Sequence, residues 1–308
     1  MRVRVATAAA ILASGLGSAS TVSAQPRAEI PPLPELKFAE IPAASRDKYL
    51  GDRWSYMETG RADQPALVLL HGVGANSMHW RFQLAGLSDR FHVVAWNAPG
   101  YVLSDALKTD APGCRDYADA LNDFLAALKF ERINVVANSF GTRVAQCFAI
   151  HYPGRIIKLA MTGTGIGPHG LSDEEKQKVI ATREAQIAKG GYGFGARVSV
   201  LVGPNASTET VELVRDVVRA TNPRGFMHGV KLGLADGYSP EEVAPSLTFP
   251  VLMISGREDK VNPIDKNAAV LLKVLKQGRL EVLDGYGHLP EVEAPAVVNG
   301  LLRKFFVE

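Results

Sequence analysis

Residues 133–143 constrain this chain most, because they combine a β-branched run, a sharp turn and the start of a helix. Their sequence is INVVANSFGTR, and an apolar periodic segment follows. A small-x-Ser-x-Gly turn in this context predicts a nucleophile elbow, which lifts a strained serine out of the sheet edge. Ala137 and Gly141 supply the small side chains that such a turn needs. Ser139 is therefore the candidate nucleophile, and the amide of Phe140 is left free at the helix start.

The first 24 residues have the pattern of a secretory signal peptide. A short basic start precedes an apolar stretch that ends in small residues at Ala24. The stretch is too short and too broken by glycine to favour a spanning helix. We expect cleavage after Ala24 and a periplasmic or secreted mature chain without an integral membrane segment. Because Arg2 and Arg4 leave with the leader, the formal charge of +2 falls to zero. Charge therefore gives no case for binding nucleic acid or an anionic membrane.

Export to an oxidising compartment would permit a disulfide bond. The chain has two cysteines, Cys114 and Cys147, and the second lies on the helix that leaves the elbow. Neither cysteine has the spacing of a metal or redox motif. The sequence leaves open whether the two pair.

Strands and helices alternate on both sides of a helical segment. Proline-rich residues 25–45 are expected to form an extended N-terminal arm. The β-α rhythm of residues 46–163 breaks at residues 164–246, whose patterns are helical, and resumes over residues 247–308. The sequence therefore predicts an α/β fold with a mostly parallel central sheet, helices on both faces and an inserted helical cap (lid). The expected strands are residues 53–58, 66–70, 91–96, 133–137, 155–161, 250–256 and 279–283. The expected helices include residues 78–87 and 291–306.

A nucleophilic serine needs a base, and the base needs an orienting acid. The loop after the first strand beyond the cap carries Asp259, and the loop after the next strand carries His288. Both loops follow strands at the sheet edge where Ser139 emerges. Glu258 and Asp284 are weaker candidates for the acid, because the first should point elsewhere and the second is expected on a strand. The residues thus predict Ser139, His288 and Asp259 as nucleophile, base and acid.

Acyl transfer also needs donors for the developing oxyanion, typically backbone amides. We expect the N–H groups of Phe140 and of Val73, which lies in the glycine-containing loop HGVG after the strand 66–70. His71 is expected to brace that loop. No cofactor or metal is expected. His92 lies in an expected strand and His151 ends an expected helix, so both are interpreted as structural. His79, His169 and His228 have no partner at metal-ligand spacing.

Taken together, these motifs resemble the α/β-hydrolase superfamily over residues 50–163 and 245–308. The resemblance implies the fold described above and the triad order Ser, Asp, His. The chain departs from the family pattern at Ala137, where Gly is usual, and at Asn97 and Val102, where a D-x-P-G-x-G run is usual. The matching segments are HGVG at 71–74, NAPGY at 97–101, ANSFG at 137–141, GRED at 256–259 and GHLPE at 287–291.

The resemblance implies a serine hydrolase that cleaves a small-molecule carboxylic ester or lactone through an acyl-enzyme on Ser139. Parts of the chain also resemble the C–C bond hydrolases that cleave vinylogous diketones, but Leu289 stands where those enzymes carry Trp. A third hypothesis is a ligand-binding protein that retains the fold. Ser139 argues against the epoxide hydrolases and haloalkane dehalogenases, which use an Asp nucleophile. Substrate and oligomeric state are not specified by the sequence. Candidate wall residues of the acyl site are Phe194, Phe226, Met227 and Leu232, although core packing is the favoured role for any one of them.

Overall fold

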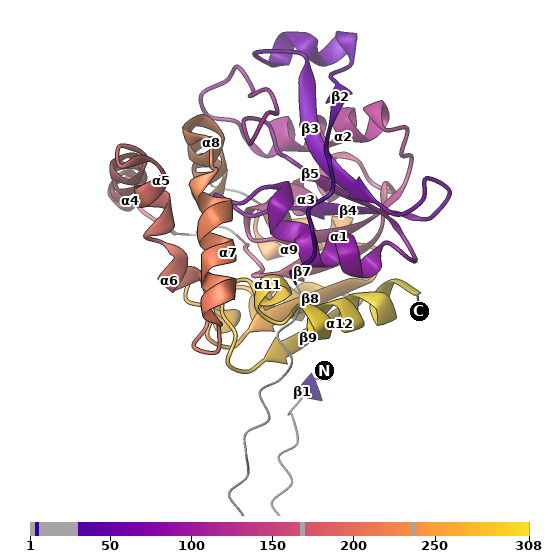
Figure 1. The fold of residues 1–308 in the computed structure, drawn as a ribbon, viewed down its shortest axis with the longest axis vertical. Coiled ribbons are helices and arrows are strands. Elements are labelled where there is room, and N and C mark those ends of the chain that lie inside the picture. Colours follow the sequence, from indigo (N-terminus) through magenta and orange to yellow (C-terminus); the bar gives the residue numbers. More distant parts are fainter. Residues whose placement is uncertain (1–3, 6–29, 167–169, 236–237, 308) are drawn as a thin grey trace, which may run out of the picture.

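The computed structural model describes residues 4–5, 30–166, 170–235 and 238–307, and a single sheet runs through its centre (Figure 1). Within these residues, nine strands lie in the order β1-β9-β8-β7-β6-β4-β5-β3-β2. Pairing is parallel from β1 to β5 and antiparallel where β3 joins β5 and where β2 joins β3. The strands are β1 (Arg4–Val5), β2 (Leu36–Glu40), β3 (Arg53–Thr59), β4 (Ala66–Leu70), β5 (His92–Trp96), β6 (Ile133–Asn138), β7 (Ile156–Thr162), β8 (Val251–Gly256) and β9 (Gly278–Leu283).

Two apolar layers cover the faces of the sheet, because successive side chains of each strand point to opposite faces. In β4, Val68 and Leu70 join one core cluster, whereas Leu67 and Leu69 join the other. The mostly parallel sheet with helices on both faces confirms the predicted α/β fold. The first layer is completed by α2 (Cys114–Ala127), α3 (Phe140–His151) and α10 (Ala268–Val274), and the second by α1 (Arg81–Leu87) and α12 (Pro295–Val307).

A helical insertion separates β7 from β8, in the segment where the sequence predicts a cap. The described residues of this segment contain helices and connecting turns but no strand. In Figure 1 its helices α4 to α8, coloured brown to orange, stand together to one side of the sheet. Capping boxes at Ser172 and Ser239 begin the first and the last α-helix of the insertion, respectively. The helices are α4 (Asp173–Ile187), α5 (Gly190–Gly195), α6 (Val198–Leu201), α7 (Thr208–Arg219), α8 (Pro223–Leu234) and α9 (Pro240–Val243), followed by the 3₁₀ turn η3 (Ala244–Ser246).

The N-terminal segment is part of the sheet rather than only an arm. Residues 30–42 contain no helix, and Leu36–Glu40 within them forms the edge strand β2, antiparallel to β3, before the 3₁₀ turn η1 (Ala43–Lys48) begins. Residues 25–29 of the predicted arm lie outside the described residues. Pro31, Pro32 and Pro34 precede the strand and Pro42 follows it, so none of the four removes a hydrogen bond of the ladder. Arg4–Val5 falls in the stretch interpreted as a leader, and the rest of that stretch lies outside the described residues. Among the described residues, no helix has the length and apolarity needed to cross a bilayer.

Two predicted helices are each divided into shorter elements. The helix expected over residues 78–87 begins as a 3₁₀ turn, η2 (Ser77–Trp80), before α1 continues it. The helix expected over residues 291–306 is broken at Pro295 into α11 (Pro290–Glu293) and α12. Proline disfavours helical backbone at the residue before it, so the chain bends there. The bend leaves α11 as a short turn directly beside the loop of His288.

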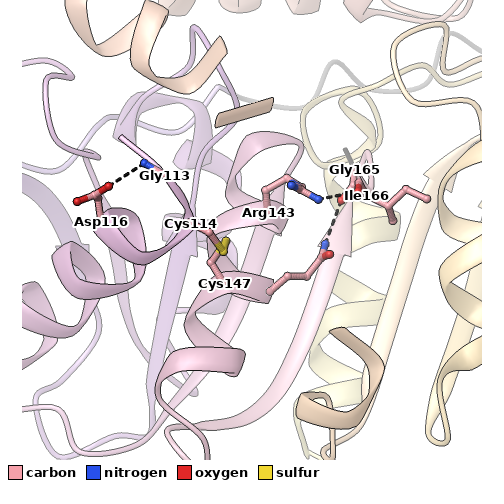
Figure 2. The surroundings of a disulfide bond; sticks show 8 residues. Gly113, Cys114, Asp116, Arg143, Cys147, Gly165 and Ile166 are labelled. Carbon is pink, nitrogen blue, oxygen red and sulfur yellow. Dashed lines mark hydrogen bonds between the residues drawn. A yellow bond between two sulfur atoms is a disulfide. The ribbon is translucent and has the colours of Figure 1, made fainter. Parts of the chain in front are cut away.

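A disulfide bond joins Cys114 and Cys147, the pairing that the sequence left open (Figure 2). Cys114 is the first residue of α2 and Cys147 lies in α3, and their Cα atoms are 5.3 Å apart. On the same helix as Cys147, Arg143 donates to the carbonyl of Ile166 at 2.6 Å. The disulfide therefore anchors the helix that leaves the elbow to its neighbour.

Candidate active site

Ser139 occupies the turn between β6 and α3 in a strained backbone conformation. Its φ is +51°, in the left-handed region that residues with a Cβ rarely adopt. Gly141 lets the helix leave this turn, since a Cβ at that position would stand 2.1 Å from the carbonyl oxygen of Leu70. Gly72 also packs closely against this turn, because a Cβ at its position would stand 2.6 Å from Oδ1 of Asn138. The turn thus has the geometry predicted for a nucleophile elbow.

Asp259 and His288 form a buried pair across two loops. Nδ1 of His288 lies 2.8 Å from Oδ2 of Asp259, and the other carboxylate oxygen accepts the amides of Val261 and Asn262, each at 2.8 Å. Burial opposes the charge of Asp259. The hydrogen bond and charge of His288, together with the two amides, outweigh burial and lower the pKa of Asp259. The acid is therefore an ionised acceptor that holds His288 by one ring nitrogen.

Residues that the sequence did not single out fix this pair in place. Nδ2 of Asn262 donates to the carbonyl of Gly163 at 2.8 Å, and Nδ2 of Asn138 donates to the carbonyl of His288 at 3.3 Å. Gly163 has a φ of +49°, and a Cβ there would stand 2.8 Å from Nδ1 of His288. The histidine can take its position only because this residue is glycine.

The two alternative acids have other partners. Glu258 accepts the amide of Gly285 at 2.8 Å. Asp284 lies just past β9, not on the strand as predicted, and it pairs with Arg257 in the exposed part of the loop. Asp259 is therefore the acid that the structure brings to His288.

The amides of Val73 and Phe140 have the backbone setting expected of oxyanion donors. Phe140 is the first residue of α3, so its N–H has no acceptor within the helix. Val73 lies in a turn closed by the amide of Ala75 and the carbonyl of Gly72, with Gly74 at a φ of +81°. In a turn of this kind, the N–H at the position of Val73 takes no part in the closing bond.

His71 braces the loop of Val73, as predicted. It is fully buried, its Nδ1 lies 2.9 Å from the carbonyl oxygen of Gly72, and its Nε2 accepts the amide of Ala98 at 3.1 Å. Burial lowers the pKa of His71 to about 4. A neutral ring thus connects the loop of Val73 with the turn after β5.

Two cavities meet at Ser139. One, of about 260 Å³, is bordered by Ser139, His288 and residues of the helical insertion, most of them valine and leucine. The other, of about 340 Å³, is bordered by Ser139, Phe140 and the loop after Val261. The predicted wall residues do not border either cavity. Phe194, Phe226 and Met227 pack in a core within the insertion, and Leu232 packs against the sheet layer.

Comparison with known proteins supports the same fold. A sequence model of the family described as "alpha/beta hydrolase fold" matches residues 65–187. Epoxide hydrolase 1 of Caenorhabditis elegans is 27% identical over 280 residues, which span 82% of this chain and 67% of that protein. 3-oxoadipate enol-lactonase 2 of Acinetobacter baylyi is 25% identical over 264 residues, or 80% of this chain and 90% of that protein. A thermophilic esterase from Thermogutta terrifontis superimposes with a TM-score of 0.75 at 22% identity, covering 88% of this chain and 98% of the esterase.

The chain has the α/β-hydrolase fold, and the family model of that name matches residues 65–187 of it. Its relatives named as hydrolases align over most of its length, which supports hydrolase activity.

The loop after β5 contains the two residues, Asn97 and Val102, that depart from the family pattern. Oδ1 of Asn97 accepts the amide of Ser77 at 2.7 Å, while its Nδ2 donates to Oγ of Ser55 at 2.9 Å. A carboxylate could accept the first bond but could not donate the second. Val102 has a φ of +50°, which explains why glycine is usual there.

Further polar residues support this hydrolase's site, and the sequence did not mark them. Glu293 accepts the amides of Gly203, Gly287 and Leu289 at 2.7, 3.0 and 3.3 Å, so it connects the loop of His288 with the insertion. Burial raises the pKa of Glu293 although these amides oppose the shift. The signal available in the sequence was only its position, five residues after His288.

Proposed function

We propose that this α/β hydrolase cleaves a carboxylic ester or lactone through an acyl-enzyme on Ser139. The observation that carries the proposal is the buried Asp259–His288 pair, whose histidine borders the same cavity as Ser139. A strained serine, a histidine held by one nitrogen and two unengaged backbone amides are the parts that acyl transfer requires.

In the proposed reaction, Oγ of Ser139 attacks the substrate carbonyl while Nε2 of His288 takes the hydroxyl proton. The amides of Val73 and Phe140 donate to the resulting oxyanion. The carbon–oxygen bond to the leaving alcohol then breaks, and His288 returns the proton to that oxygen. Water repeats the sequence on the acyl-enzyme and releases the acid and free Ser139. Asp259 keeps Nδ1 of His288 protonated and stabilises the imidazolium that forms twice in the cycle.

Ester chemistry suits a serine better than epoxide opening does. Attack of Ser139 on an epoxide would leave an ether, which water cannot readily hydrolyse, whereas attack on an ester leaves an acyl group that water removes. Relatives named epoxide hydrolases therefore inform the fold of this chain more than its substrate. The two cavities at Ser139 offer separate space for the acyl part and the leaving group of an ester.

Turnover of a small substrate panel tests the proposal. The full chain and its Ser139→Ala variant would be assayed with a short-chain aryl ester, an aliphatic lactone and a ring-fission diketone. A fluorophosphonate probe followed by mass spectrometry would report covalent modification of Ser139. We expect ester or lactone hydrolysis and labelling, both lost in the variant. Turnover of the diketone alone would favour C–C cleavage, and no turnover would favour the ligand-binding protein; either overturns the proposal.

We also propose that the chain is exported and cleaved after Ala24. The leader-like sequence supports this, and a disulfide between Cys114 and Cys147 suits an oxidising compartment. N-terminal sequencing of the protein recovered from periplasmic and extracellular fractions is expected to begin at residue 25. Recovery in the cytoplasm with Met1 intact would contradict export.

A further inference from the structure

Two arginines of the helical insertion, Arg183 and Arg197, border the cavity of about 260 Å³ at Ser139. Arg183 comes from α4 and Arg197 precedes α6, so two separate elements bring their guanidinium groups to one cavity. The same cavity is bordered by Ser139 and His288. Among the described residues that border it, none is aspartate or glutamate.

Neither arginine is neutralised within the described part of the chain. Arg183 donates to the side-chain amide of Gln186 at 3.1 Å, and the guanidinium of Arg197 has no hydrogen-bond or ion-pair partner there. Other arginines behave differently: Arg303 pairs with Asp89, and Arg257 pairs with Asp284. An arginine brought into an apolar wall without an acidic partner is costly unless a ligand supplies the charge.

The electrostatic setting agrees with this geometry. Burial, together with the smaller effect of the nearby charge of Arg183, lowers the pKa of Arg197 to about 10. Burial also lowers the pKa of Arg183. Two like charges that share one wall repel each other, and an anion between them would relieve the repulsion.

We propose that Arg183 and Arg197 bind a carboxylate carried by the acyl part of the substrate. The hydrolase would then act on small esters or lactones that bear a carboxylate, an inference that rests on the ester or lactone hydrolysis proposed above. Guanidinium groups suit this role because their planar donors match carboxylate geometry. Size adds a limit: the cavity of about 260 Å³ lies below the roughly 300–1,000 Å³ of sites for drug-sized ligands, so the acyl part is short.

A matched pair of substrates tests the inference. The enzyme would be assayed with 4-nitrophenyl hemiglutarate and with the corresponding ester whose terminal carboxylate is an amide. The variants are Arg183→Gln, Arg197→Gln, both together, and Arg219→Gln, which removes a cation of the insertion outside the cavity. We expect kcat/KM to favour the anionic ester, and the double variant to lower this preference about 10- to 100-fold, the range for hydrogen bonds to charged groups. Arg219→Gln is expected to leave the preference unchanged.

A binding measurement separates failure of this inference from failure of the proposed function. Titration calorimetry of the Ser139→Ala protein would use glutarate and glutaramide as ligands. We expect glutarate binding that weakens at least about tenfold when both arginines are replaced, and little binding of glutaramide. If neither ester is hydrolysed but glutarate binds in this manner, the proposed function fails and the carboxylate site stands. A preference for the neutral ligand, or arginine variants that bind glutarate normally, would overturn the inference. Should the double variant not fold, the single variants decide in the same way.

Discussion

Two histidines that border the same cavity, His288 and His79, each contact a buried carboxylate, and the differences between the two pairs show what the proposed catalytic pair requires. His288 and Asp259 are 3% and 1% exposed, and His79 and Glu291 are 3% and 0% exposed. Nε2 of His79 lies 2.6 Å from Oε1 of Glu291. Burial and distance are thus nearly equal in the two pairs, so neither property identifies the catalytic one.

The pairs differ in which ring nitrogen is engaged and in how the carboxylate is held. Asp259 takes Nδ1 of His288 and leaves Nε2 to exchange protons, whereas Glu291 takes Nε2 of His79. Both oxygens of Asp259 have partners, but within the described residues Oε2 of Glu291 has none. In the proposed mechanism the first pair orients a base. The second pair connects η2, which follows the loop of Val73, to α11, which follows His288.

Replacing the carboxylate of Asp259 or of Glu291 by an amide is expected to give the largest difference in kcat between the two pairs. Asp259→Asn keeps the shape but favours the wrong tautomer of His288, so we expect kcat to fall about 10⁴-fold. Glu291→Gln touches no reacting atom, and we expect a loss of less than about tenfold. Steady-state kinetics on the best substrate of the panel would measure both, with circular dichroism as the control for folding. Equal losses in kcat would remove the distinction between the pairs.

For the His79–Glu291 pair, we expect substitutions to affect the stability of the protein more than its kcat. His79→Ala leaves the carboxylate of Glu291 buried without its partner, which costs about 3–5 kcal/mol in the free energy of unfolding. Replacing the pair together, as His79→Leu with Glu291→Met, removes the buried charge and is expected to recover most of that loss. Urea unfolding would measure the three proteins. A double variant no more stable than His79→Ala would show that the pair does not act as a buried ion pair.

The positions of Ser139, His288 and Asp259 at one sheet edge could be predicted because each depends on a local signal. The elbow sequence dictates the turn at Ser139, and a loop that follows a parallel strand must lie at the same sheet edge as other such loops. The same reasoning predicts that Asp259 and His288 lie near each other, and their side chains are 2.8 Å apart. The β-α rhythm likewise predicted the sheet, although the helix beginning at residue 291 hid the break at Pro295.

The remaining features depend on packing between distant segments, which a local pattern does not encode. His79 and Glu291 are 212 residues apart and meet only because η2 and α11 pack together. In the sequence, Arg183 and Arg197 resemble ordinary surface arginines, because no local pattern shows that the folded insertion brings them to the cavity. The same limit explains why the candidate wall residues could not be separated from core residues by sequence: Phe194 packs edge-to-face against Phe226 inside the insertion.

The disulfide is expected to stabilise the scaffold without touching either pair. The bond closes a loop of 33 residues between Cys114 and Cys147, for which loop-closure entropy predicts about 3–4 kcal/mol. Replacing both cysteines by alanine should lower the free energy of unfolding by about that amount while kcat at 25 °C stays unchanged. Denaturant unfolding and turnover measured on one preparation would check this. A large loss of kcat in the folded variant would show that the bond also positions the elbow helix.

His71 is a third buried histidine, and its hydrogen-bond partners within the described residues are backbone groups instead of a carboxylate. The pKa of His71 falls from 6.5 to about 4 on folding, so below pH 6.5 the unfolded chain binds a proton that the folded chain refuses. Stability is therefore complete above pH 6.5 and declines as the pH falls toward 4, by about 3 kcal/mol from this residue. Urea unfolding from pH 7 to pH 4 should show a shallower decline for His71→Gln, although that variant is less stable at pH 7. His228, whose pKa is also lowered to about 4, contributes equally to both proteins. Parallel declines would mean that His71 is protonated in the folded protein, and the neutral brace of the Val73 loop would have to be abandoned.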